Sequence, residues 1–242
     1  AQPGDLLPPC WHWLYFLPLA RQSEIGADGH PKRGGFLPPV PLPRRMWAGS
    51  RIEFHAPLRL GQSLQRTSCI EDVRLKEGRS GPLVFVNVRH EILADGQLAV
   101  VDRHDIVYRD NPKPGDPVLP AQAAPADAAW TRTIVPDDVL LFRYSALTFN
   151  GHRIHYDRKY VTEVEGYPGL IVHGPLIATL LMDLLRRPQV SYPHIQALGG
   201  SEVSEAVGEQ IEIMARYAGY IDRQAEEIER FKRHEETRLP EA

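Results

Sequence analysis

Alternating apolar and polar positions dominate the chain from residue 48 to residue 109. Four runs carry the pattern, SRIEFHAPLRLG from Ser50, LQRTSCIEDVRLKEG from Leu64, PLVFVNVRHEILADG from Pro82 and QLAVVDRHDIVYRD from Gln97. A period of two is typical of half-buried strands. The Asp95-Gly96 pair between the last two runs predicts a hairpin turn. The segment therefore predicts consecutive antiparallel strands in one curved sheet.

The pattern changes after residue 130. Residues 130–135 resemble a short strand, and Pro136-Asp137-Asp138 is typical of a helix start, which predicts a helix over 139–149. Residues 176–187 are almost continuously apolar and end before Pro188, which predicts a buried helix. Together with the strands, these helices indicate an α+β protein.

The first 49 residues are rich in proline and aromatic side chains, as in PPCWHWLYFLP and GGFLPPVPLPRRMW. The prolines exclude a long helix or a central strand. Large aromatic side chains are usually buried, so we expect a loop segment that either packs over the sheet or lines a substrate channel.

Composition shifts divide the chain into four parts. We predict a first sheet unit over 1–110, a Pro/Ala-rich linker over 111–129, a second unit that carries the chemistry over 130–200, and a helical tail over 201–242. The tail has apolar residues in alternating steps of four and three, which is the seam of a long amphipathic helix. Its members are Val207, Ile211, Met214, Ala218, Ile221, Ala225 and Ile228.

The overall composition is that of an ordinary globular protein, with 43% hydrophobic and 24% charged residues. A net charge of −3 gives no indication of a nucleic-acid surface. The two cysteines, Cys10 and Cys69, exclude a disulfide framework and a Cys-rich zinc site, and they favour a reducing, cytoplasmic location. No apolar run reaches the roughly 18 residues of a membrane span, and the start of the chain lacks the basic region of a signal peptide.

Polar, titratable residues gather between positions 150 and 157, where Asn150, His152, His155, Tyr156 and Asp157 lie. A metal site is disfavoured because no third ligand follows at a recognisable spacing. A Ser/His/Asp hydrolase is disfavoured because Ser145 lies outside a G-x-S-x-G turn. The absence of a P-loop and of G-x-G-x-x-G argues against nucleotide phosphates.

Acid–base catalysis with an oxyanion site remains. A neutral histidine can accept a proton from water and return one near physiological pH, and His155 suits this role with Asn150 as an orienting amide. Gly174 opens the apolar helix, so its backbone N–H could polarise a carbonyl group. Gly174 could equally be an ordinary glycine at a helix start, and His173 is interpreted as a structural histidine.

The segment Asn150-Gly151-His152-Arg153-Ile154-His155, with Ile171-Val172-His173-Gly174 downstream, resembles the hydratase motif of the MaoC-like double hot-dog family. The similarity covers about residues 8–187 and is greatest to type-2 hydroxyacyl-thioester dehydratases and itaconyl/mesaconyl-CoA hydratases. It implies a hot-dog fold, in which an antiparallel sheet surrounds a central helix. It also implies reversible addition of water to the double bond of an enoyl-CoA, with no cofactor.

In that resemblance His155 is the general acid/base, position 150 orients water and the Gly174 N–H binds the thioester oxygen. The sequence departs from the motif in two places: the usual aspartate is Asn150, and the usual Asn-Pro pair is His152-Arg153. We therefore expect His155 to transfer the proton alone, assisted by Asn150 and His152. Candidates for binding CoA phosphates or a substrate carboxylate are Arg44, Arg45, Arg143, Arg153 and Tyr156.

The tail resembles a different family. Residues 209–224 and 234–240 are similar to the C-terminal helical domain of the GidA/MnmG tRNA-modifying proteins, although nothing resembles their flavin-binding region. This tail stands where the strands of a second hot-dog unit would follow Pro188. A chimeric sequence would explain this, and so would completion of the sheet by a second copy, which leads us to expect a homo-oligomer. The competing function is an inactive binding module that docks a partner through the tail.

Overall fold

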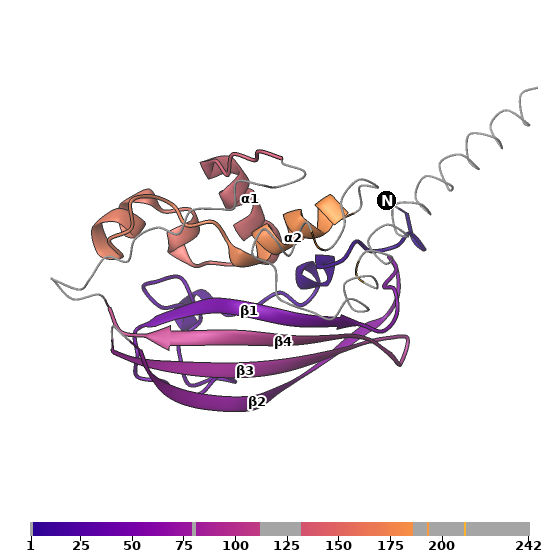
Figure 1. The fold of residues 1–242 in the computed structure, drawn as a ribbon, viewed down its shortest axis with the longest axis horizontal. Helices are drawn as coiled ribbons and strands as arrows, with labels where there is room; N and C mark the ends of the chain where they lie inside the picture. Colours follow the sequence, from indigo (N-terminus) through magenta and orange to yellow (C-terminus); the bar gives the residue numbers. More distant parts are fainter. Residues whose placement is uncertain (1, 79–80, 112–131, 186–192, 194–210, 212–242) are drawn as a thin grey trace, which may run out of the picture.

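A four-stranded antiparallel sheet forms the larger layer of the molecule (Figure 1). The computed structural model describes residues 2–78, 81–111 and 132–185, together with residues 193 and 211. The strands are β1 (Arg44–Phe54), β2 (Leu64–Gly78), β3 (Gly81–Ala94) and β4 (Gln97–Arg109), in the order β1-β4-β3-β2. The predicted antiparallel sheet is confirmed. Its first strand begins at Arg44, inside the segment that the prolines had assigned to loop.

The predicted hairpin turn joins β3 to β4. Ala94 pairs with Gln97, and the two residues between them have positive φ, 50° at Asp95 and 84° at Gly96. Positive φ at both central residues matches the right-handed twist of the flanking strands, and Asp-Gly adopts it readily.

The N-terminal segment packs against one face of the sheet. Val40 is buried against β3 and β4 in one cluster, and Leu7 and Phe16 pack against the two strands in a second. The short helix η1 (Trp11–Leu14) is tied to β4, because the Trp13 indole N–H donates to Asp102 at 2.8 Å. Packing over the sheet, one of the two expectations for this segment, is therefore confirmed, although Trp11 and Phe36 remain largely exposed.

A layer of short helices lies on the β1 side of the sheet (Figure 1). It contains α1 (Asp138–Thr148), η3 (Arg153–His155), η4 (Tyr160–Val164) and α2 (Gly174–Leu185), and a further short helix, η2 (Gln22–Glu24), lies in the N-terminal segment. The Asp137 side chain caps α1 by accepting from the Leu140 N–H. Leu141, Tyr144 and Leu176 form the core between α1 and α2. Both predicted helices are confirmed.

The strand predicted at residues 130–135 is wrong for the part that the structure describes. Residues 132–185 contain no strand, and Val135 is exposed just before the cap of α1. Two or three alternating positions without a neighbouring strand do not form a ladder, so this segment serves as the approach to a helix.

Several predictions lie outside the described residues. They concern most of the linker (112–129), the chain that follows α2 and the tail seam, of which only Ile211 is described. Of the helices that are described, none combines the length and apolarity needed to cross a membrane.

Candidate active site

A cavity of about 1160 Å³ opens where the helical layer meets the start of β1. Its walls come from three parts of the chain: the N-terminal segment between residues 18 and 37, β1 and β4, and residues 142–175. Seven of the predicted site residues line it, namely Arg45, Asn150, His152, Arg153, His155, Tyr156 and Gly174. The N-terminal segment contributes to this lining, and Trp47 is the large aromatic side chain from the first 49 residues that does so. That the cavity is a substrate channel stays a prediction.

His155 is the best-defined acid–base group in this cavity. Its Nδ1 lies 2.6 Å from the Ile171 carbonyl oxygen, which can only accept, so Nδ1 carries the proton and Nε2 holds the lone pair. The Ile171 N–H donates to Ile154 at 3.0 Å and fixes this carbonyl against η3. Burial lowers the pKa of His155 to about 4, against a smaller opposing effect of the hydrogen bond to Ile171. The ring is therefore neutral at physiological pH.

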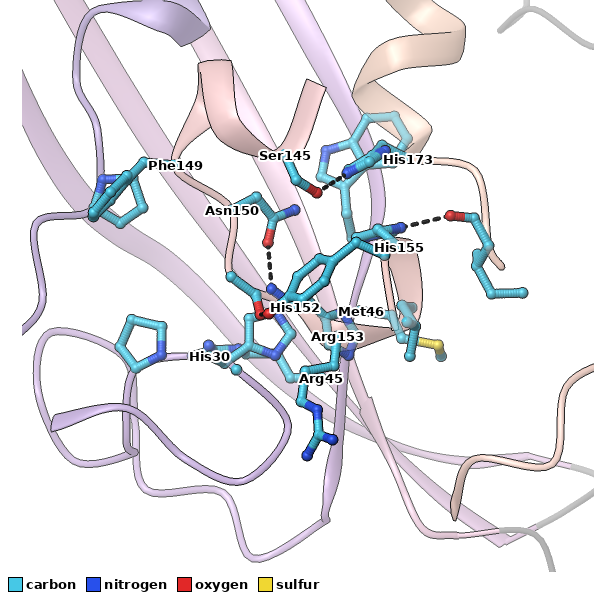
Figure 2. A pocket seen from close by; sticks show the side chains of 18 of the residues that line it. His30, Arg45, Met46, Ser145, Phe149, Asn150, His152, Arg153, His155 and His173 are labelled. Carbon is cyan, nitrogen blue, oxygen red and sulfur yellow. Dashed lines mark hydrogen bonds between the residues drawn. The ribbon is translucent and has the colours of Figure 1, made fainter. Parts of the chain in front are cut away.

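Four imidazoles lie in a row along the cavity (Figure 2). The ring centroids of His30 and His152 are 3.9 Å apart, those of His152 and His155 are 5.4 Å apart, and those of His155 and His173 are 3.7 Å apart. Burial is the main cause that lowers the pKa of His152 to about 2 and that of His173 to about 3. Burial also lowers the pKa of His30. The row is a set of neutral rings held close together in a poorly solvated place.

His173 closes one end of the row. Its Nε2 lies 2.8 Å from the Ser145 hydroxyl, and its buried Nδ1 has no hydrogen-bond partner in the part of the chain that the structure describes. Ser145 thus pairs with His173 and not with His155, while Asp157 accepts from Arg153. The structure does not bring together the Ser/His/Asp set that the sequence analysis had disfavoured.

Asn150 sits immediately after α1, beside the cavity. Phe149 ends the helix in the left-handed region with φ 52°, and the Asn150 Oδ1 accepts from the His152 N–H at 3.0 Å. One oxygen lone pair and the amide N–H₂ remain for a ligand. Figure 2 shows this amide beside the His152 backbone, with its nitrogen on the side of Ser145.

Gly174 begins α2 at the cavity wall. As the first helical residue it has no acceptor for its N–H within the helix, which leaves this donor available for an anionic group. A Cβ at this position would lie 2.1 Å from Trp47 Cε3, so β1 approaches the helix start too closely for any side chain. The glycine therefore has a packing reason as well as the chemical one that the motif suggests.

Residues 26–31 form a part of the site that the sequence analysis missed. Gly29 has φ 87°, a Cβ there would lie 1.8 Å from the Gly151 oxygen, and the Arg153 N–H donates to the Asp28 carbonyl at 2.9 Å. This loop brings Asp28 and His30 to His152, so that one potential ligand atom of each lies within 4.8 Å of the others. The Asp28-Gly29 turn followed by a histidine was the available signal, but nothing in the chain order linked it to residue 152.

The candidate binding residues differ in the hydrogen bonds and ion pairs that their side chains already make within the protein. Arg153 donates to Asp157 and to the Ala27 carbonyl, and Tyr156 donates to the Gly151 carbonyl at 2.8 Å. Arg44 forms a salt bridge of 2.9 Å with Glu165 beside a second cavity. Arg143 is exposed on α1 and does not line the main cavity. Arg45 lines both cavities, and its side chain makes no ion pair or hydrogen bond with the residues that the structure describes.

Comparison with known proteins places this geometry in a family. The family model described as hydroxyacyl-thioester dehydratase type 2 matches residues 10–197. The chain belongs to this family. The membership confirms the expected dehydratase resemblance and the sheet-plus-helix architecture of a partial double hot-dog. A second model, the C-terminal helical domain of the tRNA modifying enzyme MnmG/GidA, matches residues 173–225, as the tail had suggested.

Two curated relatives match over most of the chain. Mesaconyl-C(4)-CoA hydratase from Chloroflexus aurantiacus is 56% identical over 193 residues, which are 77% of this chain and 68% of that protein. The mitochondrial hydroxyacyl-thioester dehydratase type 2 of Schizosaccharomyces pombe is 28% identical over 210 residues, which are 76% of this chain and 69% of that protein.

Similarity to solved structures is more distant. HtdX from Mycobacterium tuberculosis shares 20% identity with a TM-score of 0.45, and the match covers 60% of this chain and 57% of that one. A second protein from the same organism, described as having a double hot-dog fold, shares 18% identity with a TM-score of 0.41, over 75% of this chain and 59% of that one.

Proposed function

We propose that this protein catalyses reversible hydration of an α,β-unsaturated acyl-CoA thioester, with mesaconyl- or itaconyl-type dicarboxylic acyl groups as the substrate class. The observation that carries the proposal is the orientation of His155, whose Nδ1–H is committed to the Ile171 carbonyl so that Nε2 is a neutral base. The 56% identity to a mesaconyl-CoA hydratase supports the substrate class.

The reaction can be written on these residues. As the water oxygen bonds to the β-carbon, His155 Nε2 takes one of its protons and the π electrons move to the thioester oxygen. The Gly174 N–H, at the positive end of α2, donates to that oxygen. The enolate then collapses, and its α-carbon takes the proton back from His155. Dehydration follows the same steps in reverse, and His155 ends in the form in which it began.

The low pKa of His155 suits the second half of this cycle. A ring whose pKa is lowered to about 4 is a weak base but, once protonated, a strong acid towards the enolate carbon. Tight stacking on His173 at 3.7 Å restricts the ring to one orientation. Neutral neighbours on both sides mean that its charge is transient, because no carboxylate of the described residues contacts the ring to stabilise the imidazolium.

Loss of the enoyl-thioester absorbance on mesaconyl-, itaconyl- and crotonyl-CoA tests the proposal. We expect turnover by the wild type and a 10²- to 10⁴-fold lower kcat for His155→Ala, roughly the contribution of a general acid–base group. His55→Ala is the matched control, because this histidine is exposed on the surface and is not among the residues that line the cavity. A folded wild-type protein that turns over none of the three thioesters would contradict the proposal and favour a binding module.

A further inference from the structure

The loop of residues 26–31 is built to hold one histidine in a fixed place. The Gly26 N–H donates to the His30 carbonyl at 2.7 Å, which closes the loop on itself. The Arg153 N–H and Nη1 then donate to the Asp28 and Ala27 carbonyls, 2.9 and 3.0 Å away. Three hydrogen bonds thus fix the loop to itself and to the start of η3, two residues before His155.

Asp28 fixes His30 by two hydrogen bonds of 3.0 Å, one from the His30 backbone N–H to Oδ1 and one between Nδ1 and Oδ2. Burial raises the pKa of Asp28, but the hydrogen bonds and charge interactions with His30, together with a smaller effect of His152, outweigh it and hold this pKa at about 2. The carboxylate is therefore ionised and can only accept. The proton of His30 must lie on Nδ1, which leaves Nε2 as an acceptor.

The ring of His30 points toward the other three imidazoles of the row and not toward solvent. It lies against His152, with centroids 3.9 Å apart, and both residues line the main cavity (Figure 2). Asp28, His30 and His152 each offer one polar atom within 4.8 Å of the others. One water molecule hydrogen-bonded to two groups at about 2.8 Å each spans about 4.5 Å between them, so groups within this 4.8 Å limit lie close enough to share one water molecule.

Water fits this place better than a metal ion does. Arg45 faces His30 and His152 closely enough that its charge contributes to the lowering of both of their pKa values, and it would repel a second cation. Asp28 and Glu165 are the negative groups that act on His30. Asp28 is already engaged by His30, and Glu165 by Arg44.

We propose that Asp28 and His30 form a water-positioning unit of the active site, in which His30 Nε2 accepts a hydrogen bond from the water whose other proton His155 takes. The inference rests on the proposed hydratase function. His30 gives the water a second hydrogen-bond acceptor beside Asn150, whose Oδ1 already uses one of its two lone pairs to accept from the His152 N–H. His30 is a positioning residue here: it orients the water and leaves the proton transfer to His155.

The test compares His30→Ala, His30→Gln and Asp28→Ala with wild type, and His55→Ala as the surface control. Water is not the varied substrate, so we expect kcat to fall about 10²-fold in His30→Ala and Asp28→Ala while KM for the acyl-CoA changes little. His30→Gln keeps an acceptor oxygen and should recover part of the loss. A purely structural role would instead lower the thermal midpoint and leave kcat of the folded fraction unchanged.

Nitrogen-15 NMR of the histidine rings provides a readout that does not depend on turnover. We expect His30 to be in the Nδ1–H form in wild type and to lose this preference in Asp28→Ala. This comparison tests the inference even if His30→Ala does not fold. An Nε2–H form in wild type overturns the inference. So does a His30→Ala enzyme within threefold of the wild-type kcat, or activity that EDTA abolishes and Zn²⁺ restores. A wild type inactive on every thioester overturns the proposed function and this role together, whereas an unaffected variant of an active enzyme overturns this role alone.

Discussion

Trp47 and Gly174 are in such close contact that the first strand of the sheet determines which residue can open α2. A Cβ on Gly174 would lie 2.1 and 2.2 Å from two carbons of the indole ring. The indole N–H in turn donates to Ser50 on the same strand at 3.3 Å. The helix start, and with it the backbone N–H proposed to bind the thioester oxygen, is therefore positioned by the sheet.

Replacing Gly174 by alanine should damage the protein through this contact. We expect Gly174→Ala to lose about 1–3 kcal/mol of unfolding free energy, the usual cost of overpacking, and to lower kcat by shifting the N–H. The free energy is measured by urea unfolding. The double variant Trp47→Ala/Gly174→Ala removes the clash and keeps the N–H. If kcat recovers in the double variant, glycine is required at position 174 because of Trp47. If kcat does not recover, glycine is required because the substrate occupies the space that a Cβ would fill.

Gly29 offers a sharper test of the loop that carries His30, because the chain contains a matched control. Gly29 and Gly34 have φ 87° and 89°, but a Cβ on Gly29 would lie 1.8 Å from the Gly151 oxygen, whereas a Cβ on Gly34 meets nothing within 4 Å. Both alanine variants carry the same backbone strain. We expect Gly29→Ala to lose at least tenfold in kcat and Gly34→Ala to keep it. Equal kcat values for the two variants would show that the loop need not dock on Gly151.

The sequence predicted the sheet well and the site only in part. Local signals sufficed for the strands after Ser50, the Asp95-Gly96 turn and both helices, because alternation, turn residues and caps act over a few positions. The segment around His155 could be found because its residues are adjacent in the chain. The contribution of His30 could not, since its loop is more than 100 residues away and only the fold brings it to Gly151. The start of β1, which carries Arg45 and Trp47, was likewise missed, because the prolines before it led to a prediction of loop.

Ser145 should matter for stability more than for catalysis. Its hydroxyl is the partner of His173 Nε2 at 2.8 Å, and among the described residues the other ring nitrogen of His173 has none. Ser145→Ala leaves a buried ring without a hydrogen bond, so we expect a loss of about 1–3 kcal/mol in urea unfolding and little change in kcat. Ser68→Ala is the control, because Ser68 pairs with His90 at 2.7 Å in a less buried place. A large fall in kcat at unchanged stability would instead place Ser145 in the reaction.

The histidine row should make folding sensitive to mild acid. His152, His155 and His173 have folded-state pKa values lowered from 6.5 to about 2, 4 and 3, mainly by burial. In the unfolded chain these rings take up protons below about pH 6.5, whereas in the folded chain they do not. Their stabilising contribution is therefore complete above that pH and falls as the pH drops, by about 1.4 kcal/mol per pH unit for each ring.

Urea unfolding between pH 7.5 and 5.5 measures the total slope, to which His30, His90 and His104 also contribute because burial lowers their pKa values too. Asp28 does not contribute in that range, because its pKa changes from 3.8 to about 2. His152→Gln should lower the slope by about one proton. A free energy that stays constant down to pH 5.5 would show that the rings are better hydrated than their burial indicates.

Arg45 is the candidate whose role depends on the substrate. It lines the cavity beside His30 and His152 and makes no ion pair within the described residues, unlike Arg44 and Arg153. If it binds the free carboxylate of a dicarboxylic acyl group, Arg45→Met should raise KM for mesaconyl-CoA about 10- to 100-fold, the usual effect of losing a charged hydrogen bond. KM for crotonyl-CoA, which lacks that carboxylate, should change little.

The matched control is Arg51→Met on the same strand, since Arg51 is largely exposed. Removing the Arg45 charge raises the pKa of His30 and of His152, so kinetics at pH 8 keep both rings neutral in every variant. An equal rise in KM for mesaconyl- and crotonyl-CoA would assign Arg45 to the CoA phosphates, which the two substrates share. No rise for either would remove Arg45 from the binding site and leave selection of the acyl group to the shape of the cavity.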